Sequence, residues 1–263
     1  MGKKIRIGAL ISGGGTNLQA VLDACESNKI NGDIVFVGSD NPDAYGLERA
    51  KKRGIPVFVV HYATIIKVFK AAPKRAVLPS DFDYADILSK QSLFKPDTAP
   101  ETIEAFLKTR AIAEAALLNQ IRSNPVDLLI LAGFMRNLTP YFIDRFNLDP
   151  KHPRIMNIHP AILPAFPGVD GYGDTFRYGC KVGGCTVHFI DYGEDSGPII
   201  GQRAFQIQAD DTIDSIKKKG LKLEWALYPE CIQMFAGGRL KTVKKAYVLP
   251  SGKKLKRTVV KIV

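Results

Sequence analysis

Residues 4–27 read KIRIGALISGGGTNLQAVLDACES, and this stretch decides the fold class. It begins with a β-branched and aliphatic run, which predicts a buried strand. After the glycines at 13–15, Leu18, Val21 and Leu22 recur at helical spacing. A strand, a glycine-rich turn and a helix in this order are typical of an α/β protein that has helices on the faces of a parallel sheet.

The alternation of strands and helices continues along the chain. The hydrophobic patterns predict further strands at 33–40, 55–61, 127–134, 154–160, 183–190 and 197–207, and helices at 44–54, 98–123, 139–146 and 210–238, the last capped by Asp211 and made irregular by Gly220 and Pro229. The most apolar strand is DLLILAGF at 127–134, which places it at the centre of the sheet. We therefore expect an α/β fold with a mainly parallel, twisted sheet and an antiparallel portion near residues 184–208.

The domain organisation follows from where this alternation is interrupted. We expect one domain over residues 1–240 that contains an insertion at about 63–109. Pro73, Pro79 and Pro96 break any period in the first part of the insertion, so short helices are expected there. The insertion is predicted to cover a pocket mouth or to make an oligomer contact.

The positive charge of the chain is concentrated at its C-terminal end. The formal net charge is +11, and the segment from Arg239 to Val263 contains nine Lys or Arg residues and no Asp or Glu. The rest of the chain is therefore nearly neutral. Residues 241–263 alternate in polarity on both sides of a Pro-Ser-Gly turn, which favours a basic C-terminal hairpin or tail protected by lysines over a patch that binds nucleic acid.

Several classes of protein are excluded by composition. No stretch of 18 or more apolar residues is present, and the N-terminus lacks the pattern of a secretory signal, so we expect a cytoplasmic protein with no membrane partner. The four Cys and four His residues do not fall at metal-ligand spacing, so no metal site is expected.

Three polar segments are predicted to meet at one edge of the sheet. Gly13–Asn17, Gly133–Arg136 and Asn157–His159 each follow or end a strand, and ligands of open α/β sheets bind beyond the carboxyl ends of the strands. Glycines before a helix N-terminus suit a phosphate, although the spacing fits neither common nucleotide fingerprint and a plain tight turn explains it as well.

His159 is the strongest candidate for catalysis in this group. It ends a strand beside the amide of Asn157, and Pro160 and Pro164 stiffen the segment that follows. The acidic loop at 191–198 supplies carboxylates, of which one is expected to take part in chemistry and the others to be solvated. His188, in the middle of an apolar run, is expected to be a structural residue.

Five segments together resemble the folate-dependent formyltransferases. They are LISGGGTNLQA, LAGFMRNLTPYFIDRF, IMNIHPAILPAFPG, GCTVHFIDYGEDSGPII and EWALYP, in that order, and the resemblance extends over residues 5–60 and about 110–240. It implies a Rossmann-like formyltransferase fold and transfer of a formyl group from the co-substrate 10-formyltetrahydrofolate to the amine of glycinamide ribonucleotide, in purine biosynthesis. It implies small-molecule substrates and no metal, and we expect a monomer or homodimer.

The resemblance also implies roles for individual residues. It assigns catalysis to Asn157, His159 and Asp195, the substrate to Gly15, Thr16, Asn17 and Glu224, and the folate to Arg110, Met135, Arg136, Asn137, Leu138 and Asn157. In this interpretation Asn157 and His159 hydrogen-bond the formyl oxygen, and Asp195 orients His159 and helps to move the proton of the amine.

Some positions depart from the family pattern, and other functions stay open. Asn137 stands where an aliphatic residue is usual, and Ala165 and the stretch 168–176 replace a more basic or His-bearing segment.

A formyltetrahydrofolate deformylase uses a similar site with water, but its N-terminal regulatory domain is not expected here. A methionyl-tRNA formyltransferase needs a longer C-terminal part. The alternative that this chain is a non-catalytic folate- or nucleotide-binding protein is disfavoured, because Asn157, His159 and Asp195 are all present.

Overall fold

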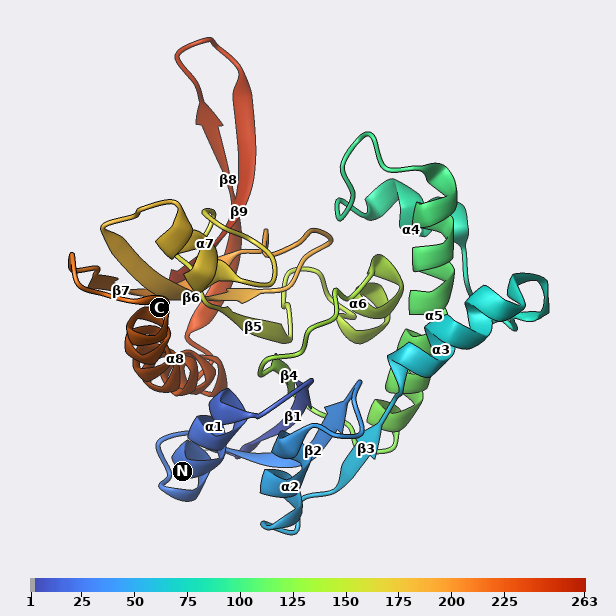
Figure 1. The fold of residues 1–263 in the computed structure, drawn as a ribbon, viewed down its shortest axis with the longest axis horizontal. Helices are drawn as coiled ribbons and strands as arrows, with labels where there is room; N and C mark the ends of the chain where they lie inside the picture. The colour runs from blue at the N-terminus through green and yellow to red at the C-terminus, as the bar shows by residue number, and fades with distance from the viewer. Residues whose placement is uncertain (1–2) are drawn as a thin grey trace.

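The centre of the molecule is a seven-stranded sheet (Figure 1). The computed structural model describes residues 3–263. In sequence order the strands are β1 (Ile5–Ile11), β2 (Gly32–Ser39), β3 (Val57–Val59), β4 (Leu128–Leu131), β5 (Ile155–His159), β6 (Val182–Phe189) and β7 (Ile199–Gln206). Their spatial order is β3-β2-β1-β4-β5-β6-β7, parallel through β5, after which β6 and β7 are antiparallel. This confirms the predicted mainly parallel sheet with an antiparallel portion.

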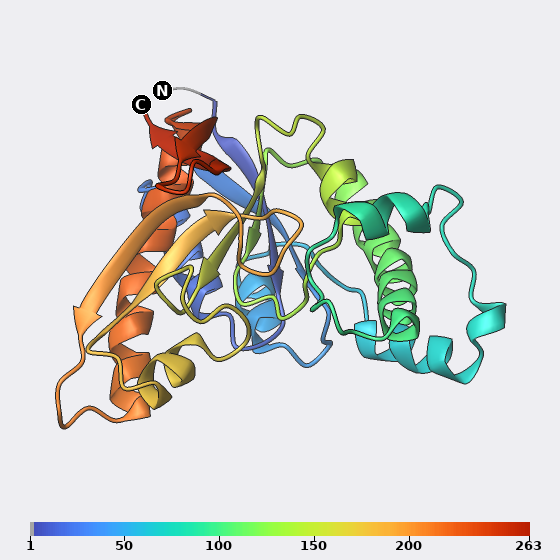
Figure 2. The same ribbon diagram turned by 90° about the horizontal axis from the view of Figure 1, so that it is seen from above.

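Helices cover both faces of the sheet, as Figure 2 shows. In sequence order the helices of the molecule are α1 (Thr16–Glu26), α2 (Tyr45–Lys51), α3 (Tyr62–Ala71), the short η1 (Pro73–Arg75), α4 (Tyr84–Lys90), α5 (Pro100–Arg122), α6 (Pro140–Phe146), α7 (Gly171–Arg177) and α8 (Ile213–Ala236). One hydrophobic core joins α1, α2 and α8 to the sheet, and the other joins α3 to α6 to its opposite face. Successive residues of β1 divide between the two cores, with Ala9 in one and Leu10 in the other, which explains why the strand is apolar from Ile7 to Ile11.

β4 is the central strand, as its composition predicts. All four of its residues are buried, and it pairs with β1 on one side and β5 on the other. Tyr228 of α8 lies beneath this pair, with its hydroxyl 3.0 Å from the Leu131 oxygen and 2.9 Å from the Met156 oxygen. Because β4 pairs in parallel with both β1 and β5, the carboxyl ends of the three strands lie side by side, which brings the three predicted polar segments to a common edge.

The start of α8 was predicted one residue too early. Thr212, not Asp211, is the N-cap: its hydroxyl accepts from the Ser215 N–H at 3.2 Å, and the Ser215 hydroxyl accepts from the Thr212 N–H at 3.0 Å. This reciprocal capping box satisfies two N–H groups that the helix leaves unpaired. Asp211 instead accepts hydrogen bonds from the Ser215 hydroxyl and the Lys219 ammonium group.

Gly220 and Pro229, where the sequence predicts irregularities, do not interrupt α8. The helix runs without interruption past Gly220 and Pro229. Leu227, Tyr228 and Cys231 around the proline are buried, and their packing outweighs the loss of one backbone N–H.

α7 was not predicted, because its seven residues contain two glycines and show no apolar period. It is held by tertiary contacts. Tyr172 packs against α8 where Gly220 leaves room, since a Cβ at Gly220 would lie 2.1 Å from the tyrosine ring.

The predicted insertion contains α3, η1 and α4, so the expectation of short helices is confirmed. Phe69 and Ile87 are buried there, and Ile87 belongs to the same core as the long helix α5.

The basic C-terminal segment forms the predicted hairpin, β8 (Leu240–Val248) and β9 (Lys254–Ile262), which projects from the body in Figure 1. Its base is attached through Leu240 and Val260, which pack against the core. Further out, Lys245 stands directly opposite Arg257.

Within residues 3–263, no helix has the length and hydropathy needed to cross a membrane. In the same range, no group of three or more His, Cys, Asp or Glu side chains is arranged to hold a metal ion.

Glu114 of α5 is fully buried and joins this helix to the start of α6. Its carboxylate accepts from the Thr139 N–H at 2.8 Å and from the Thr139 hydroxyl at 2.6 Å. Burial raises the pKa of Glu114 to about 8, although the bonds from Thr139 oppose this. The folded protein therefore keeps a proton that the unfolded chain releases above a pH of about 4.5.

This pKa makes the stability of the fold depend on pH. Because the folded-state pKa is raised, the contribution of Glu114 is fully present below a pH of about 4.5 and is lost as the pH rises through about 8. Glu114→Gln, which stays neutral and can keep both bonds, should flatten the decline of the urea midpoint across this range. Glu104→Gln, at a half-exposed position, should keep the slope of the parent protein. An unchanged slope in Glu114→Gln would contradict the assignment.

Candidate active site

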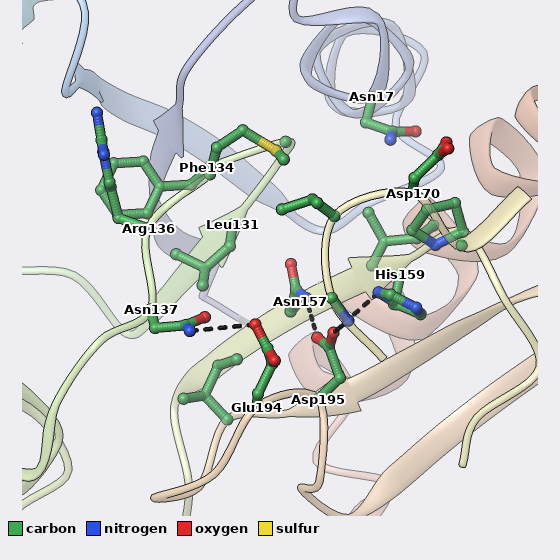
Figure 3. A pocket seen from close by; sticks show the side chains of 18 of the residues that line it. Asn17, Leu131, Phe134, Arg136, Asn137, Asn157, His159, Asp170, Glu194 and Asp195 are labelled. Carbon is green, nitrogen blue, oxygen red and sulfur yellow. Dashed lines mark hydrogen bonds and ion pairs between the residues drawn. The ribbon is translucent and has the colours of Figure 1, made fainter. Parts of the chain in front are cut away.

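A cavity of about 470 Å³ opens at the carboxyl ends of β4 and β5 (Figure 3). Among the residues that line it are ten of those predicted for the site: Asn17, Arg110, Met135, Arg136, Asn137, Leu138, Asn157, His159, Asp195 and Glu224. Gly15 and Thr16 do not line it; they lie at the N-terminus of α1, next to Asn17. The structure thus brings together residues from most of the length of the chain.

His159 and Asp195 form a buried pair at one wall of the cavity. The His159 Nδ1 lies 3.1 Å from the Asp195 Oδ2, and only 3% of the histidine side chain and 12% of the aspartate side chain are exposed. The His159 Nε2 lies 2.8 Å from the Phe166 carbonyl oxygen. Both ring nitrogens therefore face acceptors, an arrangement that favours the doubly protonated imidazolium.

The pKa values of the pair move apart. Burial lowers the pKa of His159, but the hydrogen bond and charge of Asp195 outweigh burial and raise it above its ordinary value. Burial also opposes ionisation of Asp195, yet bonds from His159, from His188 and from the Gly168 N–H hold its pKa well below the usual range. The site thus keeps a negative carboxylate beside a histidine that is readily charged.

Asn157 completes this group. Its Nδ2 lies 3.4 Å from the Asp195 Oδ1 and 3.3 Å from the His188 Nε2, and its Oδ1 points away from Asp195 in Figure 3. The His188 Nδ1 lies 2.9 Å from the Phe189 carbonyl oxygen, and the His188 Nε2 lies 3.5 Å from the Asp195 Oδ1. His188 is buried, as expected of a structural residue, but it also contacts two residues of the predicted catalytic set.

The backbone around the pair is constrained. Asp195 has a φ of 48° and Phe166 a φ of 54°, both in the left-handed region that residues other than glycine seldom adopt. The Gly168 N–H donates to the Asp195 Oδ2 at 2.8 Å. Conformations of this kind persist only where the surroundings fix them, and they concentrate at functional sites.

Glu224 forms a second buried polar centre in the lining of the cavity. Its carboxylate accepts from the Asn17 Nδ2 and from the Tyr172 hydroxyl, each at 2.6 Å. Burial raises the pKa of Glu224, and the two donors oppose the rise. The Asn17 Oδ1 is buried and has no hydrogen-bond partner within residues 3–263, so the cavity offers an acceptor there.

The glycine-rich loop before α1 is fixed from outside. The Gly13 carbonyl accepts from the Gly46 N–H at 3.0 Å and the Gly14 carbonyl from the Arg49 Nε at 2.8 Å. Gly15 has a φ of 68°, and a Cβ there would lie 2.8 Å from the Gly46 Cα, so only glycine fits. The loop leaves N–H groups of the α1 N-terminus available to an anion.

The segment 135–138 forms another wall. Its conformation is set by the Met135 N–H, which donates to the Ser12 hydroxyl at 2.8 Å, and by Arg136, which pairs with Asp40 at 2.5 Å. Asn137 donates to the Glu194 carboxylate at 3.2 Å (Figure 3). Asn137, which replaces the aliphatic residue usual in the family, thus has a polar partner in Glu194.

Arg110 of α5 lies deeper in the same wall. It is 7% exposed, and its guanidinium lies over the rings of Phe106 and Tyr62, at 4.4 and 5.1 Å from their centroids. Its Nε has no partner within the described chain. An unpaired, buried guanidinium N–H favours an anionic or carbonyl ligand.

Among the residues that line or contact the site, the sequence analysis gave no site role to Tyr172, His188 and Glu194. Glu194 belongs to the acidic loop, but its partner lies more than 50 residues away in the chain. Tyr172 lies on a helix without an apolar period. For His188 the available signal was its proximity to the acidic loop, which sequence alone did not distinguish from a place in the core.

The arrangement supports acid–base chemistry on a polar substrate. The imidazolium of His159 can stabilise a developing negative charge, and ionised Asp195 holds it in place. Glu224 and the α1 N-terminus, on another side, suit a ligand that has both hydrogen-bond donors and a phosphate.

Comparisons with known proteins show the family of the chain. Residues 5–232 match the family described as formyl transferase. The chain is 33% identical over 242 residues to the phosphoribosylglycinamide formyltransferase of Escherichia coli, covering 92% of each protein. It is 34% identical to part of the trifunctional purine biosynthetic protein adenosine-3 of Chironomus tentans, of which it spans 14%.

A solved structure with similar architecture is glycinamide ribonucleotide transformylase 1 of Symbiobacterium toebii, with a TM-score of 0.69 and 35% identity, covering 100% of this chain and 96% of the other. The family match extends over most of the chain, including both polar centres of the cavity. The chain therefore belongs to the formyl transferase family.

Proposed function

We propose that this protein transfers the formyl group of 10-formyltetrahydrofolate to the primary amine of glycinamide ribonucleotide. The observation that supports this most is the contact of Asp195 with both His159 and Asn157 on the wall of the cavity. The names of the relatives point to the same reaction. We place the enzyme in the cytoplasm, as a monomer or homodimer that acts on small molecules without a metal, membrane or nucleic-acid partner.

The reaction needs a site that stabilises an oxyanion. The amine nitrogen attacks the formyl carbon, the carbonyl electron pair moves to oxygen, and the bond from carbon to the folate nitrogen then breaks. The amine loses a proton and the leaving folate nitrogen gains one, so charge balances. His159 opposes the oxyanion with its positive charge when its Nε2–H turns from the Phe166 carbonyl to the substrate.

Asn157 and Asp195 have complementary parts in this scheme. The Asn157 amide reaches the formyl oxygen as a donor when it turns from His188. The low pKa of Asp195 makes it a weak base, so it orients His159 and the amine and guides the proton rather than retaining it.

The substrate is proposed to bind on the side of Glu224. Its phosphate lies against Gly15 and Thr16 at the N-terminus of α1, where N–H groups are unpaired. The ribose or amine end reaches Glu224, and the unpartnered Asn17 Oδ1 accepts a hydroxyl.

The folate is proposed to lie along the wall formed by 135–138. Leu138 offers an apolar contact and backbone groups for the pterin, and Arg110 offers its unpaired Nε to a carboxylate of the folate. Residues 1–240 are then the catalytic domain, and residues 241–263 an appended hairpin.

The reaction is tested by following folate release from 10-formyltetrahydrofolate with and without glycinamide ribonucleotide. Release that requires the ribonucleotide is expected. Release in water alone would identify a deformylase, and no release in either case would refute both activities.

His159→Ala should lower kcat by at least about a hundredfold, the scale of losing one group that stabilises an oxyanion, with little change in KM. Asn157→Ala should act in the same direction. His152→Ala is a matched control, because this side chain is 78% exposed and contacts Asp149 at the surface. Parent-like turnover in His159→Ala would refute the mechanism.

Glu224→Gln should raise KM for the ribonucleotide by about ten- to a hundredfold, the scale of a hydrogen bond to a charged group, while KM for the folate stays near the parent value. Steady-state kinetics with each substrate varied in turn would measure this. Glu230→Gln, in the same helix but at the surface, should behave as the parent. A rise confined to the folate KM would place the two substrates the other way round.

A further inference from the structure

The loop from Asp191 to Pro198 joins β6 to β7 and contains Asp195 in its left-handed conformation. Inside the loop, the Asp191 carboxylate accepts from the Ser196 hydroxyl at 2.6 Å and from the Gly193 N–H at 3.2 Å. A strained residue in a connecting loop keeps its place only if its neighbours are fixed. The contacts that fix this loop from outside therefore matter for Asp195.

One such contact comes from the insertion. The segment directly after α4 reaches the loop, and Figure 1 shows the two side by side. The Ser92 N–H donates to the Tyr192 carbonyl at 2.9 Å, and Ser92 and Gly193 form a parallel bridge. A Cβ at Gly193 would lie 2.8 Å from the Ser92 hydroxyl oxygen, so glycine permits this close approach.

A second contact passes through Asp144 of α6. The Tyr192 hydroxyl donates to the Asp144 Oδ1 at 2.5 Å, and the Lys90 ammonium group, at the end of α4, donates to the Asp144 Oδ2 at 2.9 Å. Lys90 also pairs with Asp86 at 2.7 Å. Burial and the bond to Asp144 raise the pKa of Tyr192 to about 12, so its hydroxyl remains a donor at neutral pH.

These contacts join the insertion to the loop at Tyr192 and Gly193, which lie three and two residues before Asp195. Asn137 adds a bond to Glu194, the residue between. The loop is thus held at consecutive positions on its way to Asp195, and the points of attachment lie on the segment after α4, on α6 and on the segment after β4.

We propose that Lys90 and Ser92 of the insertion form a clamp together with Asp144 of α6, and that this clamp holds Tyr192 and thereby keeps Asp195 against His159 and Asn157. This inference rests on the proposed function, because Asp195 matters only if the site transfers a formyl group. Lys90, Asp144 and Tyr192 are positioning residues, since none of the three lines the cavity. The insertion would then contribute to catalysis rather than only cover the pocket.

Tyr192→Phe removes one bond of the clamp and should lower kcat by about three- to tenfold, the scale of one hydrogen bond. Asp144→Ala, which removes both attachments to this carboxylate, should lower it further. Adding Tyr192→Phe to Asp144→Ala should cause no additional loss, because the same bond is already absent. KM for the ribonucleotide should stay within about twofold of the parent in each variant, because Glu224 is held by Asn17 and Tyr172 and not by the clamp.

The pH profile separates positioning from plain loss of stability. The charged and titratable groups that act on His159 are Asp195, from the loop, and Glu224, from α8. If Asp195 moves away, the pKa of His159 falls, and the alkaline limb of kcat should shift to lower pH in Tyr192→Phe. A variant that is only less stable would have the same alkaline limb of kcat as the parent when it is assayed below its unfolding temperature.

Matched variants complete the test. Tyr84→Phe changes a tyrosine of α4 whose hydroxyl makes no hydrogen bond within the described chain, and should leave kcat and the pH profile unchanged. Lys90→Arg should retain the activity that Lys90→Ala loses. Parent-like kcat and pH profile in both Tyr192→Phe and Asp144→Ala would overturn the clamp. An inactive parent would instead refute the proposed function.

Discussion

The structure depends on a buried, ionised aspartate that needs several donors at once. Removing a carboxylate from water is costly unless the charge is paired and its oxygens are hydrogen-bonded. Asp195 obtains these partners from different parts of the chain: His159 from β5, His188 from β6 and the Gly168 N–H from the turn after β5. The sheet, the turn and the loop must all be in place before this charge is stable, so the site and the fold are formed together.

The reversal of strand direction after β5 makes this possible. In the antiparallel register of β5 and β6, Asn157 stands directly opposite His188, and residues opposite each other project from the same face of the sheet. His159 is two residues further on and shares that face. The hairpin connection then returns Asp195 to the same place. A parallel neighbour would have required a long crossover and would have placed the acidic loop elsewhere.

Much of the fold, and the edge of the sheet where the site lies, could be predicted from sequence because the patterns that mark them are local. Apolar period and glycine punctuation located the strands, and the rule for carboxyl ends of strands brought Asn17 and His159 to one rim. The roles of Asp195 and Glu224 came from a resemblance, since neither has a local pattern that distinguishes it. Strand register and long-range contacts leave no such pattern, which is why His188 and Tyr172 were missed. The contact of Ser92 with the catalytic loop, far apart in sequence, was equally invisible.

The C-terminal hairpin differs from this site in its electrostatics. Lys241 faces Lys261 and Lys245 faces Arg257 across the two strands, and like charges in that position repel. These side chains are exposed, so dissolved salt screens them over about 10 Å at 0.1 M, whereas the buried pair at the cavity is screened far less. One molecule therefore contains two electrostatic regimes. Dissolved salt therefore weakens the repulsion between the two strands of the hairpin and has little effect on the pair of His159 and Asp195.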